Sequence, residues 1–245
     1  MEPSRLAELI LQRQPCVVLT GAGVSTESGI PDFRSPGGLW SEFDPLDYGS
    51  IDSFRRDPLR IWNFYGRRFA FLAKAEPNDA HRALAELEQR GLVDAIVTQN
   101  IDLLHERAGS RAVIEVHGSI RRAVCLACAT EEPLERVLAQ LESAPAPLCP
   151  RCGGVLKPDV VFFGELLPTG ALERATELAR SAGLLLVVGS SLEVYPVSGL
   201  PLETLATGGS LAIVNRGPTA LDEHAELRLD GSAGEILRET VRALA

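Results

Sequence analysis

The chain has no hydrophobic run long enough to cross a membrane, and aromatic residues make up only 5% of its 245 residues. Its longest strongly apolar run, Leu184–Val188, suits a buried strand, whereas a membrane-spanning helix needs about 20 such residues. The N-terminus has no basic segment followed by an apolar core, which argues against a secretory signal. We therefore predict a cytoplasmic protein with no membrane partner.

Positive charge is also in short supply, with 24 basic residues against 33 acidic ones and a net charge of −9. An acidic surface disfavours direct binding to nucleic acid phosphates, and it favours basic partners such as lysine-rich protein segments. The 45% hydrophobic and 23% charged residues are otherwise ordinary for a soluble globular protein. No direct nucleic acid binding is expected, and the sequence carries no signal of oligomeric state.

Cysteine is sparse, but four of the five cysteines form two close pairs, Cys125-x2-Cys128 and Cys149-x2-Cys152. Two intervening residues let both thiolates of a pair reach one metal, and two pairs complete a tetrahedron around zinc. Four thiolates leave no position for water, which predicts a structural zinc site. Buried cysteines without metal would leave the paired spacing unexplained, and two pairs argue against a redox CxxC. Cys16 stands apart and is interpreted as a small buried hydrophobe.

Short runs rich in Val, Ile and Leu recur along the chain, separated by helical patterns or loops. These runs are Cys16–Leu19, Ala95–Val97, Val113–Ile114, Leu184–Val188 and Leu211–Val214. Strands buried on both faces have this composition, so we predict an α/β fold with a parallel sheet and helices on both sides. Helical patterns cover Asp79–Arg90, with Asn78 as a candidate N-cap, and Thr169–Arg180.

Glycines follow the first predicted strand in the segment Gly21-Ala22-Gly23, where a dinucleotide-binding fold places its pyrophosphate loop. Thr26 takes the place of the third glycine of that fingerprint, so the ordinary dehydrogenase pattern fails. Ser25 and Thr26 could donate hydroxyl hydrogen bonds to a phosphate. Taken alone, the segment fits a tight turn about as well as a nucleotide site.

Polar residues and glycines gather in five further segments, most of them at the ends of predicted strands. The segments are Gly29-Ile30-Pro31-Asp32-Phe33-Arg34, Thr98-Gln99-Asn100-Ile101-Asp102, His117-Gly118, Gly189-Ser190-Ser191 and Asn215-Arg216. Ligands of doubly wound sheets bind at the carboxyl ends of the strands, so this recurrence predicts a ligand site. His117 is the candidate for proton transfer near neutral pH. His81, His105 and His224 are interpreted as structural, although His105 could line the same cleft.

These segments, both cysteine pairs and Val161-Phe162-Phe163-Gly164-Glu165 together resemble the sirtuin family of NAD-dependent protein deacylases in its compact bacterial form. The resemblance implies a Rossmann-like NAD-binding domain and a smaller domain with a zinc-binding module and a helical module. NAD and zinc are the implied cofactors, and acyl-lysine proteins or peptides the implied partners. The expected boundaries are 1–34, 78–118 and 158–245 for the NAD-binding domain, 35–77 for the cofactor loop and helical module, and 119–157 for the zinc-binding module.

The resemblance also implies a reaction in which the acyl oxygen attacks the anomeric carbon of the nicotinamide ribose and nicotinamide leaves. His117 would then act as general base, so that the 2′ oxygen attacks the imidate carbon, with Asn100 as the second catalytic residue. The products would be free lysine, nicotinamide and 2′-O-acyl-ADP-ribose.

The cofactor contacts are likewise implied by the resemblance. Asn100, Asp102 and Gln99 would orient the ribose and nicotinamide end, Asp32 would lie near the nicotinamide amide, and Phe33 would shield the reactive carbon. The full expected set is Gly21, Ala22, Gly23, Ser25, Thr26, Asp32, Phe33, Arg34, Gln99, Asn100, Ile101, Asp102, Gly189, Ser190, Ser191, Asn215, Arg216, Ser232 and Ala233.

Substrate contacts are expected in two places. Val160, Val161 and Phe162 would form an exposed edge to which substrates add as a β-strand, with plain core packing as the alternative. Tyr65 and Arg68 resemble the pair that recognises acidic acyl groups in desuccinylase-type members, and on a helix they share one face. The alternative is a packed tyrosine beside a solvated cation, and the Asp-Phe-Arg turn of this chain is common in deacetylase-type members.

Three other functions compete with deacylation. Protein mono-ADP-ribosyl transfer is disfavoured because only deacylation needs a base such as His117 after nicotinamide leaves. A non-catalytic NAD or ADP-ribose sensor would be expected to have lost Asn100, Asp102 or His117, and all three are present. An NAD dehydrogenase is disfavoured by Thr26 and by the lack of a clear acidic ribose ligand on the second strand.

Overall fold

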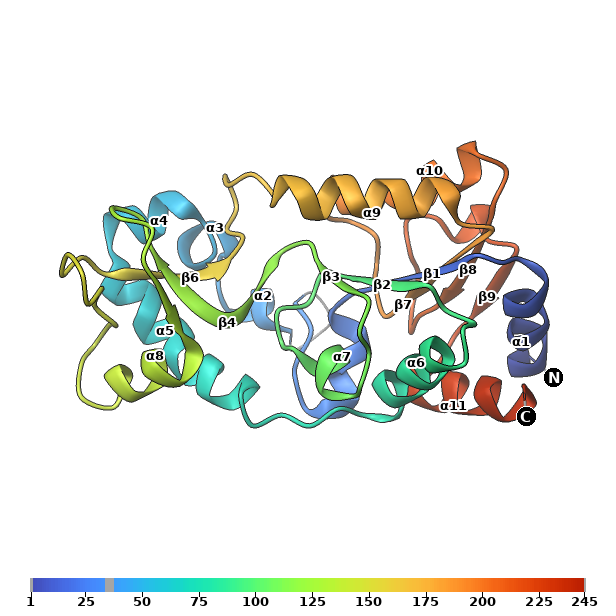
Figure 1. Cartoon of the computed structure of the whole chain (residues 1–245), viewed down its shortest axis with the longest axis horizontal. Coiled ribbons are helices and arrows are strands. Elements are labelled where there is room, and N and C mark those ends of the chain that lie inside the picture. Colours follow the sequence, from blue (N-terminus) through green and yellow to red (C-terminus); the bar gives the residue numbers. More distant parts are fainter. Residues whose placement is uncertain (1, 34–37, 245) are drawn as a thin grey trace.

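The structure, a computed structural model, describes residues 2–33 and 38–244. Figure 1 shows an elongated molecule with a large α/β part at one end and a smaller part at the other. The helices are α1 (Glu2–Gln12), η1 (Ala22–Ser28), α2 (Leu39–Glu42), α3 (Pro45–Tyr48), α4 (Ile51–Arg56), α5 (Pro58–Leu72), α6 (Asp79–Gln89), α7 (Leu104–Arg107), α8 (Leu134–Leu141), α9 (Thr169–Ser181), η2 (Val197–Gly199), α10 (Leu200–Ala206), η3 (Asp222–His224) and α11 (Ala233–Ala243). The strands are β1 (Cys16–Thr20), β2 (Ala95–Thr98), β3 (Val113–Glu115), β4 (Gly118–Cys125), β5 (Glu131–Pro133), β6 (Leu156–Val160), β7 (Leu184–Val188), β8 (Ser210–Val214) and β9 (Leu227–Leu229). Within the described ranges, no helix has the length and apolarity needed to cross a membrane.

The large part is built on a six-stranded parallel sheet with the strand order β3-β2-β1-β7-β8-β9. This order is that of a dinucleotide-binding sheet, in which the chain changes direction between the two central strands, here β1 and β7. The predicted α/β fold with a parallel sheet is therefore confirmed, and each of the five predicted strands is at most one residue longer than expected. The three-residue strand β9 was not predicted, because three residues carry no readable pattern.

Both faces of this sheet are covered by helices, as the strands without alternating polar residues predict. Val18 and Leu186 pack into a cluster with the apolar residues of α1, α6 and α11, whereas Val17 and Val187 pack against α9 and α10 on the other face. Figure 1 shows these two helical layers on opposite sides of the sheet. The predicted helices at 79–90 and 169–180 are present as α6 and α9.

The smaller part has its own sheet and its own core. Its antiparallel strands follow the order β5-β4-β6, and a third apolar cluster joins β4 and β6 to α4, α5 and α8. Trp62 of α5 is buried in this cluster, and its Nε1 donates to the Leu156 carbonyl at 2.6 Å. Strands β4 and β6 run one and three residues past the zinc-module limits expected at 119 and 157. The exact domain boundaries stay a prediction.

Candidate active site

The glycine loop closes against the carboxyl end of β7, at the point where the sheet order changes direction. A Cβ atom on Gly21 or on Gly23 would come within 2.9 Å of Gly189, and one on Gly189 would overlap the backbone of Val24. Gly189 also has a φ of 62°, which favours glycine. Gly23 N donates to Gly189 O at 2.9 Å. These glycines are thus required by contact between two loops at the crevice where such sheets bind ligands.

Ser25 lies at the centre of a buried polar network. Its Oγ donates to Asp102 Oδ2 at 2.7 Å and accepts from Asn100 Nδ2 at 3.0 Å, and the residue is 1% exposed. A hydroxyl has one proton to give, and Ser25 gives it here to Asp102; a hydrogen bond from Ser25 to a phosphate stays a prediction. Thr26 likewise donates within its own 3-10 helix, to Gly23 O at 2.9 Å.

Asp102 is engaged on both of its carboxylate oxygens. Oδ2 accepts from Ser25, and Oδ1 accepts from the backbone N of Leu104, at the start of α7, at 3.0 Å. Burial raises the pKa of Asp102, and the hydrogen bonds from Leu104 and Ser25 oppose that rise. Asp102 therefore holds Ser25 and α7 in place, and its expected contact with ribose stays a prediction.

Gln99 joins the ends of three strands. Its side-chain Nε2 donates to Ser190 Oγ at 3.1 Å and to Thr20 O at 3.3 Å. Its backbone carbonyl oxygen faces the ring of His117. Asn100, the next residue, is 8% exposed, and its backbone N donates to Thr98 Oγ1. The segment after β2 thus fixes both the loop after β7 and the histidine after β3.

His117 lies between β3 and β4 and has one ring nitrogen engaged. A carbonyl can only accept, so the 3.1 Å contact with Gln99 O places the proton of the neutral ring on Nδ1. Nε2 then carries a lone pair, and in the described part of the chain it has no hydrogen-bond partner. Burial lowers the pKa of His117, an effect that the Gln99 carbonyl opposes. A neutral, partly exposed imidazole held by one nitrogen is suited to general-base chemistry.

His81 and His105 form a buried pair behind this network, with ring centroids 4.8 Å apart. His105 Nε2 lies 2.9 Å from Thr20 Oγ1, and its Nδ1 has no partner among the described residues. His81 Nδ1 accepts from Asn78 N, and burial lowers the pKa of His81 to about 4. His81 Nε2 also lies 3.4 Å from Ser25 Oγ, a contact that the sequence does not indicate, whereas His105 was considered as a residue of the same cleft. The exposed His224 lies apart in η3.

The residues expected on the phosphate and adenosine side follow β7, β8 and β9. Asn215 Nδ2 donates to the Gly217 and Arg216 carbonyls, at 3.0 and 3.2 Å. Ser232 caps α11 and donates to Glu27 Oε1 at 2.9 Å. The backbone carbonyl of Ser191 accepts from Ala220 N, and Ala233 is buried in the first turn of α11.

Residues at the start of the cofactor loop are only partly described. Phe33 is 37% exposed and stacks on Trp40 with ring centroids 5.6 Å apart. The carbonyl of Asp32 accepts from Leu39 N at 2.9 Å. Arg34 lies outside the described residues. Ile101 is half-buried against the core of the smaller part, and its carbonyl accepts from Ile120 N.

The four paired cysteines converge at the end of β4. The four Sγ atoms all lie within 4.8 Å of one another, and the Cys125–Cys152 and Cys128–Cys149 pairs are 3.4 and 3.5 Å apart. Zinc–thiolate bonds of about 2.3 Å put tetrahedral sulfurs about 3.8 Å apart, so the four residues fit one zinc ion. Cys16 is buried in β1, and burial raises the pKa of its thiol to about 12, as expected for an inert residue.

The sequence profile of the Sir2 family matches residues 21–196. The chain belongs to the Sir2 family. It is 48% identical to the NAD-dependent protein deacetylase of Caldivirga maquilingensis, over 97% of this chain and 92% of that protein. Its identity to the NAD-dependent protein deacetylase of Thermotoga maritima is 42%, over 98% of each. A solved complex of Sir2 with a p53 peptide and NAD+ is 42% identical, with a TM-score of 0.91 over 99% of this chain and 98% of that one.

The peptide edge of this Sir2 protein differs from the expectation. Val160 and Phe162 are 5% and 3% exposed, so their side chains lie in the core and only Val161 is partly exposed. The side chains of Val160 and Phe162 pack into the third apolar cluster, which is the core packing left open as the alternative for Phe162, and backbone addition of a substrate at this edge stays a prediction. The strand itself, β6, is still at the edge of its sheet.

Tyr65 and Arg68 lie together on α5 beside this edge. The Tyr65 ring stacks on that of Phe162, with centroids 5.7 Å apart, and burial raises the pKa of Tyr65, an effect that Arg68 opposes. The guanidinium of Arg68 lies 3.7 Å from the ring centroid of Phe64, and its Nη1 donates to Phe64 O at 2.6 Å. Burial lowers the pKa of Arg68. Arg68 is therefore a held, half-buried cation and not a freely solvated one.

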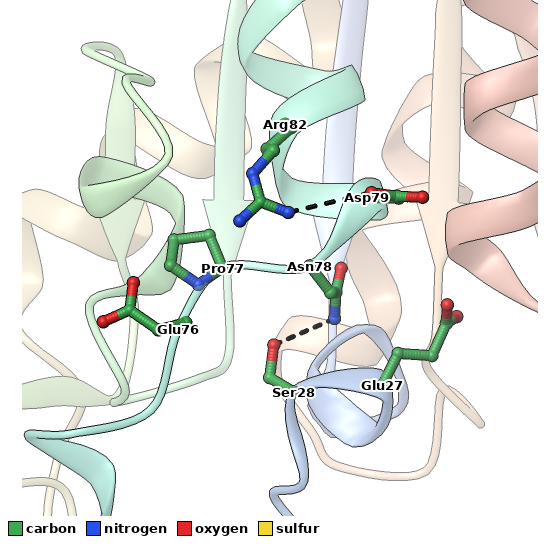
Figure 2. A pocket seen from close by; sticks show the side chains of 7 residues that line it. All are labelled: Glu27, Ser28, Glu76, Pro77, Asn78, Asp79 and Arg82. Carbon is green, nitrogen blue, oxygen red and sulfur yellow. Dashed lines mark hydrogen bonds and ion pairs between the residues drawn. The ribbon is translucent and has the colours of Figure 1, made fainter.

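A groove of about 430 Å³ lies elsewhere, between the end of η1 and the start of α6 (Figure 2). Its lining residues are Glu27, Ser28, Glu76, Pro77, Asn78, Asp79 and Arg82. None of the expected site residues is among them. In Figure 2, Asn78 reaches Ser28 and Arg82 reaches Asp79, so the groove is bordered by side chains already engaged with one another.

Proposed function

We propose that this chain is an NAD-dependent protein-lysine deacylase whose products are deacylated lysine, nicotinamide and 2′-O-acyl-ADP-ribose. The observation that carries the proposal is His117, held through Nδ1 by Gln99 O with Nε2 left as a base. NAD, when bound, supplies the ribose that accepts the acyl group. The crevice at the ends of β1 and β7, where glycines let two loops approach closely, is where such sheets bind the pyrophosphate of a dinucleotide.

His117 would take a proton from a ribose hydroxyl through Nε2, because its lowered pKa keeps the ring neutral near pH 7. Asn100 would orient the nicotinamide ribose, since its amide is fixed by Ser25. Mono-ADP-ribosyl transfer would not need a base in this place, which is why the engaged geometry of His117 favours deacylation.

The zinc ion would act as a structural element of the smaller part. Its ligands would be Cys125, Cys128, Cys149 and Cys152, which fit a closed tetrahedral shell. The shell has no position for water or substrate. Zinc would therefore fix the sheet that ends in β6, beside which the acyl-lysine peptide would bind.

We also propose that acidic acyl groups, such as succinyl or malonyl, are accepted in addition to acetyl. Arg68 is positioned by the Phe64 carbonyl and ring, and it lies one helical turn from Tyr65. A guanidinium fixed in this way can grip a carboxylate with two hydrogen bonds. The stacked Tyr65 and Phe162 rings would form the apolar wall of the same pocket.

The proposal is tested by incubating the protein with NAD and matched acetyl-lysine and succinyl-lysine peptides, and detecting acyl-ADP-ribose by mass spectrometry. Turnover of neither peptide would refute the deacylase function. Arg68→Met should lower kcat/KM for the succinyl peptide at least about tenfold, as the loss of a charged hydrogen bond does, and leave the acetyl peptide within about twofold. Arg67→Met, at the exposed neighbour, is the control. Equal effects on both peptides would refute the acid-recognition role.

A further inference from the structure

The chain has two lysines against 22 arginines, and one of the two, Lys157 of β6, is buried. An ammonium has three donor positions, and all of them need acceptors when it is buried. Lys157 Nζ donates to Val160 O at 2.7 Å and Pro158 O at 3.0 Å, and pairs with Glu165 Oε2 at 2.9 Å. Three acceptors around one nitrogen suit a compact ammonium, whereas a planar guanidinium spreads its donors over three nitrogens.

One peptide unit links this ammonium to the backbone of His117. The carbonyl of that unit, Val160 O, accepts from Lys157, and its N–H, on Val161, donates to His117 O at 2.8 Å. A charged donor on the carbonyl polarises the peptide and strengthens the hydrogen bond that the N–H makes. Next to it, Gly118 has a φ of 69° and packs so closely on Asp159 that a Cβ would overlap the carbonyl. The position of His117 is thus tied to β6.

The same ion pair also fixes Phe162. Glu165 Oε2, which pairs with Lys157, accepts from Phe162 N at 2.8 Å. Lys157 Nζ lies 4.5 Å from the centroid of the Phe162 ring, whose stacking partner is Tyr65. Backbone and ring of Phe162 are therefore both placed by the pair, and with them the wall of the proposed acyl pocket.

We propose that Lys157, together with Glu165, is a positioning residue that sets the peptide-binding edge and His117 relative to each other. The inference rests on the proposed deacylase function, because it concerns where the acyl-lysine peptide lies. Among residues 2–33 and 38–244, the hydrogen bonds and ion pair of Lys157 go to Pro158, Val160 and Glu165, and none goes to the loops at β1 and β7 or to the network around Ser25. Loss of the Lys157 side chain should therefore weaken peptide binding and turnover and leave the affinity for NAD unchanged.

The test uses the full-length, zinc-loaded protein and four variants: Lys157→Met, the double variant Lys157→Met/Glu165→Gln, Lys157→Arg, and the control Lys74→Met at the exposed lysine. The double variant removes both charges, so no unpaired buried charge is left to unfold the chain. In Lys157→Met and in the double variant, KM for the acetyl peptide should rise at least about tenfold and kcat should fall, while KM for NAD stays within about twofold of wild type. Lys157→Arg should restore only part of the loss.

Turnover by the wild-type protein tests the deacylase function. The ratio of the variant's KM for the acetyl peptide to that of the wild type tests the positioning role of Lys157. Fluorescence anisotropy measures the affinity of each protein for the acetyl peptide in the presence of NAD. This measurement tests the positioning role even if the wild-type protein shows no catalytic turnover. A double variant with wild-type peptide affinity would overturn the inference, as would equal losses for peptide and NAD. A double variant that does not fold would also overturn it, since the pair would then serve the fold alone.

Discussion

Replacing Ser25 with Ala removes one hydroxyl from the centre of the buried network. Asn100 Nδ2 loses its acceptor at 3.0 Å and Asp102 Oδ2 loses its donor at 2.7 Å, and neither group is exposed enough to gain water readily. A buried polar group left without a partner costs about 1–3 kcal/mol, and a charged one costs more. We expect the free energy of unfolding to fall by about 2–4 kcal/mol.

For a chain of this size, about 1 kcal/mol corresponds to about 2–4 °C in Tm, so Ser25→Ala should melt about 4–16 °C below wild type. Thr26→Ala is the matched control, because its hydroxyl bonds to Gly23 O at an exposed site and should cost within about 0.5 kcal/mol. Both are read by calorimetry on the zinc-loaded protein. Equal melting temperatures for the two variants would refute the reasoning.

The loss of stability in Ser25→Ala should also depend on pH, and the structure predicts the direction of that dependence. Burial raises the pKa of Asp102 in the folded state above its ordinary 3.8. The stability that this group contributes is therefore fully present below pH 3.8 and is lost as the pH rises through the pKa of the folded state. Removing Ser25 removes a hydrogen bond to the charged form and raises that folded value further. The difference in Tm between Ser25→Ala and wild type should therefore shrink as pH falls toward 3.8, and a constant difference would show that Asp102 is not the group left uncompensated.

Three further predictions concern the reaction and the metal. His117→Ala should lower kcat about 10²–10⁴-fold while calorimetric NAD affinity stays within about threefold; full activity would exclude the residue as base. Because burial lowers the pKa of His117 below 6.5, the midpoint of the acid limb of the wild-type pH–rate profile should lie below pH 6.5, and a midpoint above 6.5 would contradict this. Chelation of zinc should abolish turnover and shift the fluorescence of Trp62, which is buried in the core beside the zinc module, to longer wavelength; a chelated protein that keeps its activity would refute the structural role of the metal.

Features carried by neighbouring residues could be predicted from the sequence. The cysteine pairs need only their own spacing, and Leu184–Val188 needs only its own composition to be read as a buried strand. The polar segments at the strand ends predict a ligand site because ligands of doubly wound sheets bind at the carboxyl ends of the strands. The structure brings three of these segments together through the contacts of Gln99 with Ser190 and His117.

Features that depend on distant partners could not be predicted. The hydrogen bond from Ser25 to Asp102 joins residues 77 positions apart, and nothing near Ser25 in the sequence indicates it. Val160 and Phe162 were read as an exposed edge because the core that covers them comes from α4 and α5. Ser232 bonds to Glu27 across 205 residues, and neither residue carries a motif for that contact.

His117 stands where the two kinds of support meet. Its ring is held from the large part by Gln99 O, and its backbone carbonyl is held from β6 by Val161 N–H. A change on either side should therefore reach the same imidazole by a different path. Loss of Ser25 loosens the cofactor side, so its effect should be felt in KM for NAD, whereas loss of Lys157 loosens the peptide side. If the two supports are independent, the fold-loss in kcat/KM of the double variant Ser25→Ala/Lys157→Met should equal the product of the fold-losses of the two single variants. A departure from that product would measure how strongly the two supports couple through His117.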